Sequence, residues 1–331
     1  MITHRIHAGT PREIVDASEA AVYLLSGGFP VALPTETVYG LAAWATNSDA
    51  VMRVFTVKDR PKFDPLIVHL PDVSWLDGVA AIPAQDRPLV DRLVENFWPG
   101  PLTLVLPKKD LIPDIVTSGL GTVAVRISAN PIFQSVIQSF GQPLAAPSAN
   151  RFGRISPTTA HHVMEELGGK IHLIVDGGPT THGVESTVIT LRGSNVWILR
   201  SGPVTAEDLR PFAKTVANAS RSRMPEGPGQ LKSHYAPKTP MKLLQPDERP
   251  VGNAKGRIGL LAWCSDDDAK GFKAVEILSR NGDMRAAAAS LFAKLRTLDS
   301  AGLELIVAEP VPEEGLGFAI NDRLRKAAGN G

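Results

Sequence analysis

A short basic segment, Lys58-Asp59-Arg60-Pro61-Lys62, places three cations on alternate residues just before the apolar run 65–70. Because proline disfavours helical geometry in the residue before it, we expect this segment to be extended. Alternate side chains of an extended chain share a face, so Lys58, Arg60 and Lys62 can point at one anionic ligand. The flanking segments are rich in hydroxyls and nearly free of acids, which suits a phosphate site. A solvated charge run is the simpler interpretation of the same residues.

Other hydroxyl, amide and cationic residues fall at the ends of expected strands. Arg126 lies inside the apolar run 122–127, where a charge is costly unless it is paired. Ser156-Pro157-Thr158 opens an expected helix, whose N-terminal amides can receive an anion, although helix capping explains these hydroxyls equally well. The remaining residues of this kind are Thr35, Thr37, His69, Ser148, Asn150, Ser186 and Arg200.

Several familiar site motifs are missing from the sequence or out of context. The glycines of 119–124 resemble a dinucleotide fingerprint, but a strand follows them where that fingerprint needs a helix. The sequence has no Walker A motif, no His-Glu-x-x-His, no paired Cys-x-x-Cys and no Gly-x-Ser-x-Gly. Cys264 follows an apolar run and is expected to be a buried structural residue. Neither covalent catalysis nor a metal site built by the protein is therefore predicted.

Composition limits the class of protein. The chain has 331 residues, 43% of them hydrophobic, and a net charge of +1. This size favours two domains, and the balanced charge leaves room only for local contact with RNA. The single cysteine excludes an intramolecular disulfide framework, and there is neither a run of about 18 apolar residues nor a signal-peptide core at the N-terminus. These features predict a soluble cytoplasmic protein with no membrane segment.

Hydrophobic periodicity predicts an α/β protein with a mixed sheet, because strands and helices alternate only loosely. We expect a catalytic domain over residues 1–214, a linker over 215–240 that is rich in Pro and Gly, and a small α/β domain over 241–331. The strands are expected at 31–33, 65–70, 102–107, 122–127, 143–146, 172–176, 186–191, 195–200, 257–263, 272–277 and 303–308. The helices are expected at 12–26, 48–57, 86–97, 131–140, 158–167, 205–213, 283–298 and 315–327.

Taken together, the polar segments resemble the signature of one family. The matching segments are Pro34-Thr35-Glu36-Thr37-Val38-Tyr39-Gly40-Leu41, Lys58-Asp59-Arg60-Pro61, Pro65-Leu66, Trp98-Pro99-Gly100-Pro101-Leu102-Thr103, Pro147-Ser148-Ala149-Asn150 and Glu185-Ser186-Thr187-Val188. In order and content they are similar to the YrdC/Sua5 family, over about residues 12–210. The segment 228–237 and the C-terminal α/β segment resemble its longer, two-domain Sua5 form. One residue departs from the pattern, since Asp64 stands where many members carry Asn.

The resemblance implies a fold and an activity. The fold is an N-terminal YrdC-like domain with a twisted mixed sheet and helices, then the linker, then a small Rossmann-like Sua5 domain. The activity is that of a threonylcarbamoyl-AMP synthase, which is a nucleotidyltransferase that converts L-threonine, bicarbonate and ATP into threonylcarbamoyl-AMP and pyrophosphate. Magnesium is expected with the ATP. The product would pass to a tRNA threonylcarbamoyl transferase system, for N6-threonylcarbamoyladenosine at position 37 of tRNA, with weak tRNA contact at most.

The resemblance also implies roles for residues. Lys58 and Arg60 are the expected catalytic cations, and Arg126 is the expected partner of the threonine carboxylate. The expected threonine pocket comprises Thr37, His69, Arg126, Ser148 and Ser186. The expected nucleotide contacts are Lys58, Arg60, Asp64, Thr122, Asn150, Thr158, Arg200, His234 and Tyr235. His234 and Tyr235 would let the linker fold back as a lid, and the choice between Thr35 and Thr37 as the substrate contact stays open.

Two other functions compete with this interpretation. A non-catalytic RNA-binding module is one, but the near-zero net charge and the lack of a stacking-aromatic motif argue against it. A carbamoyltransferase of the hydrogenase-maturation type is the other, but such proteins add zinc-finger cysteines, and this chain has a single cysteine. A purely structural role for the C-terminal domain stays open, because 241–331 contains no catalytic constellation.

Overall fold

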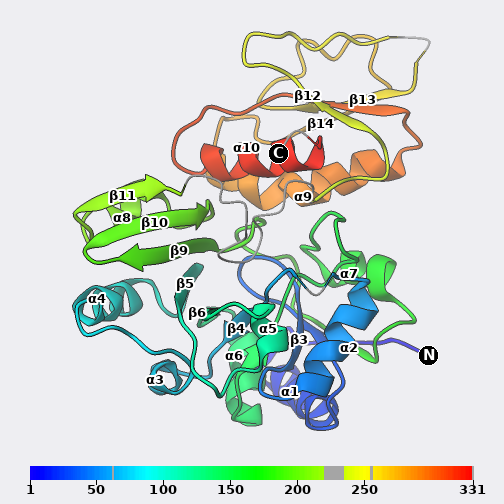
Figure 1. Cartoon of the computed structure of the whole chain (residues 1–331). Coiled ribbons are helices and arrows are strands. Elements are labelled where there is room, and N and C mark those ends of the chain that lie inside the picture. The colour runs from blue at the N-terminus through cyan, green and yellow to red at the C-terminus, as the bar shows by residue number, and fades with distance from the viewer. Residues whose placement is uncertain (62, 220–234, 254–255, 330–331) are drawn as a thin grey trace. The chain divides into compact units, whose positions relative to one another are not determined.

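The computed structural model describes residues 1–331 except 62, 220–234, 254–255 and 330–331 (Figure 1). The described chain forms two compact units. The first comprises Met1–Phe152, Pro157–Thr180 and 185–219, and the second comprises Gly153–Ser156, Thr181–Val184 and 235–329. The second unit therefore includes two short segments whose sequence positions lie within the range of the first.

The first unit is built on a mixed sheet of eleven described strands, in the order β1-β8-β2-β3-β7-β4-β6-β5-β9-β10-β11. Parallel pairs such as β4 with β6 stand beside antiparallel pairs such as β5 with β6, which confirms the mixed sheet predicted from the sequence. The strands are β1 (His4–His7), β2 (Val31–Leu33), β3 (Gly40–Trp44), β4 (Ile67–His69), β5 (Leu102–Pro107), β6 (Thr122–Arg126), β7 (Leu144–Ala145), β8 (Leu173–Asp176), β9 (Thr187–Arg192), β10 (Asn195–Arg200) and β11 (Thr215–Asn218).

Helices cover both faces of this sheet. At the β8-β2-β3-β7 end, α1 and α6 pack on one face through an apolar cluster, while α2 and α7 pack on the other. The amphipathic pattern of α1 and α6 explains this placement, because each turns one apolar stripe towards the strands. The helices of this unit are α1 (Pro11–Ser26), α2 (Ser48–Lys58), α3 (Leu76–Val79) after the 3-10 turn η1 (Val73–Trp75), α4 (Arg87–Phe97), α5 (Asp114–Thr117), α6 (Pro131–Phe140), α7 (Ala160–Leu167) and α8 (Ala206–Leu209).

At the β4-β6-β5-β9 end, the two faces of the sheet differ. In β6, Val123 and Val125 join the large core that includes α4, whereas Ala124 joins a small apolar cluster on the opposite face. That cluster is made of strand residues, namely Ile67, Val105, Ala124, Val188 and the half-buried Leu199. Thr122 and Arg126 alternate with the core valines and so share the face of Ala124. This face thus presents a strand-built apolar floor beside a buried arginine.

The second unit is a small α/β fold. Its four described strands are all parallel, in the order β12-β15-β13-β14, as in a Rossmann-like sheet. They are β12 (Met241–Leu243), β13 (Ile258–Ala262), β14 (Ala274–Ile277) and β15 (Leu305–Ala308), and the helices are α9 (Met284–Ser300) and α10 (Gly317–Ala327). Figure 1 shows α9 and α10 lying side by side along this sheet. This arrangement confirms the small C-terminal α/β fold.

The structure adds strands that periodicity did not indicate. Residues Thr215–Asn218, predicted as the start of the linker, form β11 and pair in parallel with β10. The strands β1, β3 and β12 were not predicted either. β1 and β11 lie at the two edges of their sheet and expose three and two of their four residues, respectively, so their apolar signal is weak. None of the described helices is long and apolar enough to cross a membrane.

Candidate active site

The basic segment does not run extended from Lys58 to Arg60. Lys58 is the last residue of α2, and Asp59 caps the helix in the left-handed conformation with φ of 53°. The N–H of Asp59 donates to the carbonyls of the preceding turn. The prediction that Lys58 and Arg60 share one face of an extended chain is therefore wrong, because Pro61 restricts Arg60 alone and leaves the helix free to reach Lys58. Lys62 lies outside the described residues.

Lys58 instead ties two predicted motifs together. Its side chain is buried, and Nζ donates to the carbonyl of Ser148 at 2.5 Å and to the carbonyl of Asn150. Burial and the nearby Arg60 lower the pKa of Lys58 well below its usual range, while Asp64 opposes the shift. By donating to two carbonyls, the Lys58 side chain thus holds the loop that carries Ser148 and Asn150.

Arg60 and Asp64 form a buried ion pair. The distance between Arg60 Nη2 and the Asp64 carboxylate is 2.7 Å, and both side chains are buried. Arg60 also donates from Nε to the Asp64 carbonyl and from Nη2 to the Pro65 carbonyl, both at 3.1 Å. Burial raises the pKa of Asp64, although Arg60, Lys58 and Arg200 act in the opposite direction. Asp64 is therefore a carboxylate within the electrostatic reach of three predicted nucleotide-binding cations.

A second buried cation, Arg126, ends β6. Nη2 lies 3.1 Å from a carboxylate oxygen of Glu36, and Nη1 donates to Thr37 Oγ1 at 3.4 Å. Ser128 Oγ donates to the other carboxylate oxygen of Glu36. Burial lowers the pKa of Arg126, with Arg200 in the same direction and Glu36 opposed. The Nε group is buried and has no partner among the described residues, so this guanidinium has a free donor inside the protein.

Thr35 and Thr37 have different roles. Thr35 Oγ1 donates to the carbonyl of Val38 at 2.6 Å and accepts the backbone N–H groups of Thr37 and Val38, so it holds the turn. Thr37 Oγ1 lies 2.9 Å from Thr35 Oγ1 and accepts from Arg126. The structure therefore places Thr37, and not Thr35, against the buried guanidinium.

His69 lies beside Arg126, because the two residues are register partners in the parallel pair β4–β6. Its ring packs on Phe133, with 4.5 Å between the ring centroids. Burial, and then the charge of Arg126, lower the pKa of His69 well below its usual range, so the imidazole is neutral near pH 7. Its buried Nδ1 has no hydrogen-bond partner in the described part of the chain. A neutral ring with an unpaired polar nitrogen can bind one polar group of a ligand.

Ser186, which directly precedes β9, contacts Thr103 and Arg200. Its Oγ lies 2.8 Å from Thr103 Oγ1 and accepts from Arg200 Nη2 at 3.0 Å. Arg200 Nε also donates to the Ser186 carbonyl at 3.0 Å. Gly202 crosses closely behind, because a Cβ there would lie 2.4 Å from the backbone nitrogen of Thr187. The glycine is required for this close approach, which fixes Ser186.

Thr122 and Thr158 are two further predicted nucleotide contacts. Thr122 begins β6 and Arg126 ends it, so they are about 13 Å apart along the strand, on one face. Thr158 is buried, and its Oγ1 lies 3.3 Å from His162 Nδ1. The nucleotide roles of Thr122 and Thr158 stay predictions.

Tyr235 belongs to the second unit. Its side chain is 1% exposed, its ring lies 5.5 Å from that of Phe292 on α9, and the Arg323 guanidinium of α10 lies 5.5 Å from its centroid. The backbone of Tyr235 is left-handed, with φ of 65°. These contacts describe an anchored side chain, and the predicted nucleotide contact stays untested. His234, and with it the predicted lid, lies outside the described residues.

Three buried residues of the site were not predicted as such: Glu36, Thr103 and Ser128. Glu36 and Thr103 lie inside segments that carried the family resemblance, but neither received a role from it. The sequence already indicated that Arg126 is buried, and a buried charge is costly unless an opposite charge pairs with it. Glu36 is that anion, and it could have been sought on this argument.

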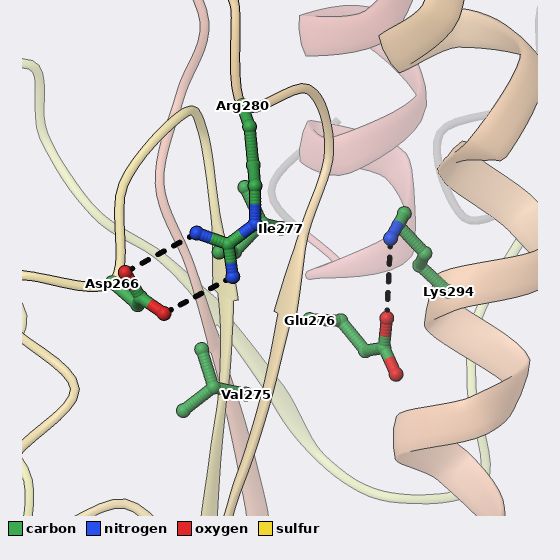
Figure 2. Close-up of a pocket in the computed structure, with 6 residues that line it drawn as sticks. All are labelled: Asp266, Val275, Glu276, Ile277, Arg280 and Lys294. Atoms are coloured by element: carbon green, nitrogen blue, oxygen red, sulfur yellow. Dashed lines mark hydrogen bonds and ion pairs between the residues drawn. The ribbon is translucent and has the colours of Figure 1, made fainter.

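The second unit contains a pocket of about 340 Å³ at the edge strand β14 (Figure 2). Its charged residues are paired with each other. Arg280 lies 3.1 Å from Asp266, and Lys294 lies 3.2 Å from Glu276. Figure 2 shows each basic side chain in contact with its acidic partner. The lining residues therefore have little net charge, and they include no nucleophile–base pair. The chemistry-bearing groups are concentrated in the first unit.

Comparison with known proteins covers both units. The family model Sua5_yciO_yrdC, described as "Telomere recombination", matches residues 23–202. A second model, described as "Threonylcarbamoyl-AMP synthase, C-terminal domain", matches residues 204–329.

Similar sequences and structures extend over nearly the whole chain. The threonylcarbamoyl-AMP synthase of Bacillus subtilis (strain 168) is 39% identical over 323 residues, which is 93% of this chain and 92% of the relative. That of Pyrococcus abyssi (strain GE5 / Orsay) is 40% identical over 319 residues, 90% of each chain. The solved structure of P. abyssi Sua5 complexed with L-threonine is similar with a TM-score of 0.87 at 35% identity, covering 100% of this chain and 98% of that one.

Proposed function

Since the chain belongs to the Sua5/YrdC family, in its two-domain threonylcarbamoyl-AMP synthase form, we propose that it forms L-threonylcarbamoyladenylate and pyrophosphate from L-threonine, bicarbonate and ATP. The observation that carries this proposal is the buried group around Arg126, in which Arg126 Nε and the neighbouring His69 Nδ1 have no hydrogen-bond partner among the described residues. Buried polar groups without partners are rare in proteins, and these two are adjacent. A small zwitterion such as an amino acid would satisfy both.

We assign the threonine to this group. The Arg126 guanidinium suits the substrate carboxylate, because a buried arginine makes strong charge-assisted hydrogen bonds. Thr37 and His69 lie beside Arg126, and together with Ser186 they are proposed to bind the remaining polar atoms of the amino acid. The relative from P. abyssi has been solved in complex with L-threonine, which supports threonine as the amino acid substrate.

We assign the nucleotide to the remainder of the same sheet face. The floor of Ile67, Val105, Ala124 and Val188 is apolar and suits a nucleobase or ribose face. The cations Lys58, Arg60 and Arg200 all act electrostatically on the Asp64 carboxylate, and a group of three cations suits a polyphosphate. The distance of about 13 Å from Arg126 to Thr122 along β6 is comparable to the length of an amino acid joined to a nucleotide.

The reaction then follows from charge. The threonine amine adds to bicarbonate with loss of water, and the resulting carbamate oxygen attacks the α-phosphorus of ATP. The bond from that phosphorus to the bridging oxygen breaks, and pyrophosphate leaves with the electron pair. No protein nucleophile is needed, because the protein acts by placing two anions together and neutralising the charge that develops. This is the chemistry of a nucleotidyltransferase.

Magnesium is proposed to arrive with ATP. No group of three or more His, Cys, Asp or Glu within the described residues could hold a metal ion. The cations Lys58, Arg60 and Arg200 and the carboxylate of Asp64 therefore fit a Mg²⁺ ion that is bound mainly by phosphate oxygens and water. Such an ion would offset part of the phosphate charge, and Lys58 and Arg60 would offset the rest.

The product is a labile mixed anhydride, so a further enzyme must accept it. We propose that it passes to a tRNA threonylcarbamoyl transferase system. The cytoplasmic location and a weak contact with tRNA, both predicted from the sequence, stay predictions.

The assay is pyrophosphate release by the full chain with ATP, bicarbonate and L-threonine, each omitted in turn. Release that requires all three supports the proposal. RNA binding without such release would favour the RNA-binding module instead.

A further inference from the structure

Asp64 is a buried acid among the cations of the proposed nucleotide site, and the role given to it below rests on that site. Its carboxylate is 2% exposed and lies 2.7 Å from Arg60 Nη2. Its charge also acts on Lys58 and Arg200. A buried carboxylate at the centre of a cation cluster is opposed to the binding of a polyphosphate, because like charges repel strongly at low dielectric. The arrangement therefore needs a reason.

The hydrogen bonds of Arg60 show what a phosphate would have to replace. Nε donates to the Asp64 carbonyl, and Nη2 donates to the Pro65 carbonyl and contacts the Asp64 carboxylate. Arginine binds phosphate through two adjacent nitrogens, either Nε with Nη2 or Nη1 with Nη2. Both arrangements need Nη2, which here already contacts the Asp64 carboxylate and the Pro65 carbonyl. Of the present acceptors, the Asp64 carboxylate is the one that an incoming anion repels.

We propose that Asp64 is an internal counter-anion of the nucleotide site, which occupies Arg60 while the polyphosphate is absent and competes with triphosphate and pyrophosphate for it. Binding of ATP then requires the carboxylate to give up Arg60, which weakens polyphosphate binding. After the reaction the carboxylate returns to Arg60 and favours departure of pyrophosphate. Asp64 is thus a positioning residue for product release, and it does not touch the reacting atoms.

Burial makes this exchange easier. The pKa of Asp64 is raised because the charged carboxylate is desolvated. The groups that face it with opposite charge are Arg60, Lys58 and Arg200, and each lowers that pKa. When phosphate oxygens take over these cations, the carboxylate loses its stabilising partners, and its displacement or protonation follows.

The test is the affinity of the full chain for inorganic pyrophosphate, measured by calorimetry with and without Mg²⁺. Asp64→Asn removes the charge and keeps the shape, and its amide oxygen can still accept from Arg60. We expect about tenfold tighter pyrophosphate binding and a lower KM for ATP, the scale of one charge-assisted hydrogen bond. Asp266→Asn, which breaks the exposed pair with Arg280 in the second unit, is the matched control and should leave both unchanged.

The other possible outcomes contradict either the role of Asp64 or the placement of Arg60 in the nucleotide site. Unchanged or weaker pyrophosphate binding in Asp64→Asn overturns the inference, and weakening only with Mg²⁺ present would mean that the carboxylate holds the metal. Arg60→Ala tests the proposed function separately, since unchanged pyrophosphate affinity there would remove Arg60 from the nucleotide site. If Asp64→Asn fails to fold, as judged by its Tm, Asp64→Ser gives the same comparison with a neutral hydroxyl.

Discussion

Comparing Arg126→Met with the double variant Arg126→Met and Glu36→Gln separates the contribution of Arg126 to stability from its contribution to threonine binding. Arg126 and Glu36 are both buried and lie 3.1 Å apart. Arg126→Met leaves the Glu36 carboxylate without its cation, which costs about 3–5 kcal/mol of unfolding free energy. Changing Glu36 as well, in Arg126→Met with Glu36→Gln, removes the uncompensated charge. The double variant should therefore recover most of that loss in a urea-unfolding experiment.

Threonine binding should not recover with it. The lost contact to the substrate carboxylate is a charge-assisted hydrogen bond, worth about 1.5–3 kcal/mol, so the KM for L-threonine should rise roughly 10- to 150-fold in both variants. The KM for ATP should change far less. The assay is pyrophosphate release with each substrate varied in turn. A double variant with the wild-type KM for L-threonine would refute the placement of the carboxylate at Arg126.

Three further predictions follow from the same contacts. Gly202→Ala places a methyl group about as close to the Thr187 backbone as the 2.4 Å of its ideal Cβ, so it should displace Ser186 and raise the KM for L-threonine with a lowered Tm. Lys58→Met removes the donor from the Ser148 carbonyl, at a cost of about 1–3 kcal/mol, and should abolish turnover; a variant that keeps wild-type turnover would contradict the positioning role. The pKa of His69 is lowered on folding, so the unfolded state binds the proton more readily than the folded state. The contribution of His69 to the free energy of unfolding therefore falls as the pH drops below about 6.5, by up to about 1.4 kcal/mol per pH unit. Urea midpoints of the wild type and His69→Gln between pH 7.5 and 5 should therefore converge as the pH falls, and parallel curves would contradict this.

The sequence predicted the longer elements well because their patterns are strong and local. Helices such as α1 and α6 have an apolar stripe, and glycines follow where they end. The error at Lys58 has an equally local cause. The helix α2 extends to Lys58 and ends at Asp59, which adopts the left-handed conformation of a helix C-cap. Glycine is the usual residue in that conformation, so an aspartate there is not recognised from the sequence.

The site itself depends on strand order, which sequence patterns do not specify. His69 and Arg126 are 57 positions apart and meet because β4 and β6 pair in parallel. The contact between Arg126 and Glu36 likewise joins two distant segments. Residue types at strand ends indicated which side chains carry chemistry, and the family resemblance indicated that they belong together. The pairing of each cation with its anion became visible only in three dimensions.

The most direct measurement for the central claim is formation of the adenylate itself. The full chain would be incubated with ATP, labelled bicarbonate and L-threonine, and the label followed into a threonylcarbamoyl–AMP adduct by chromatography and mass spectrometry. We predict a labelled adenylate formed in step with pyrophosphate and dependent on all three substrates, which Arg126→Met forms only at raised concentrations of L-threonine. Pyrophosphate release without bicarbonate, or an adenylate that carries no label, would contradict the account.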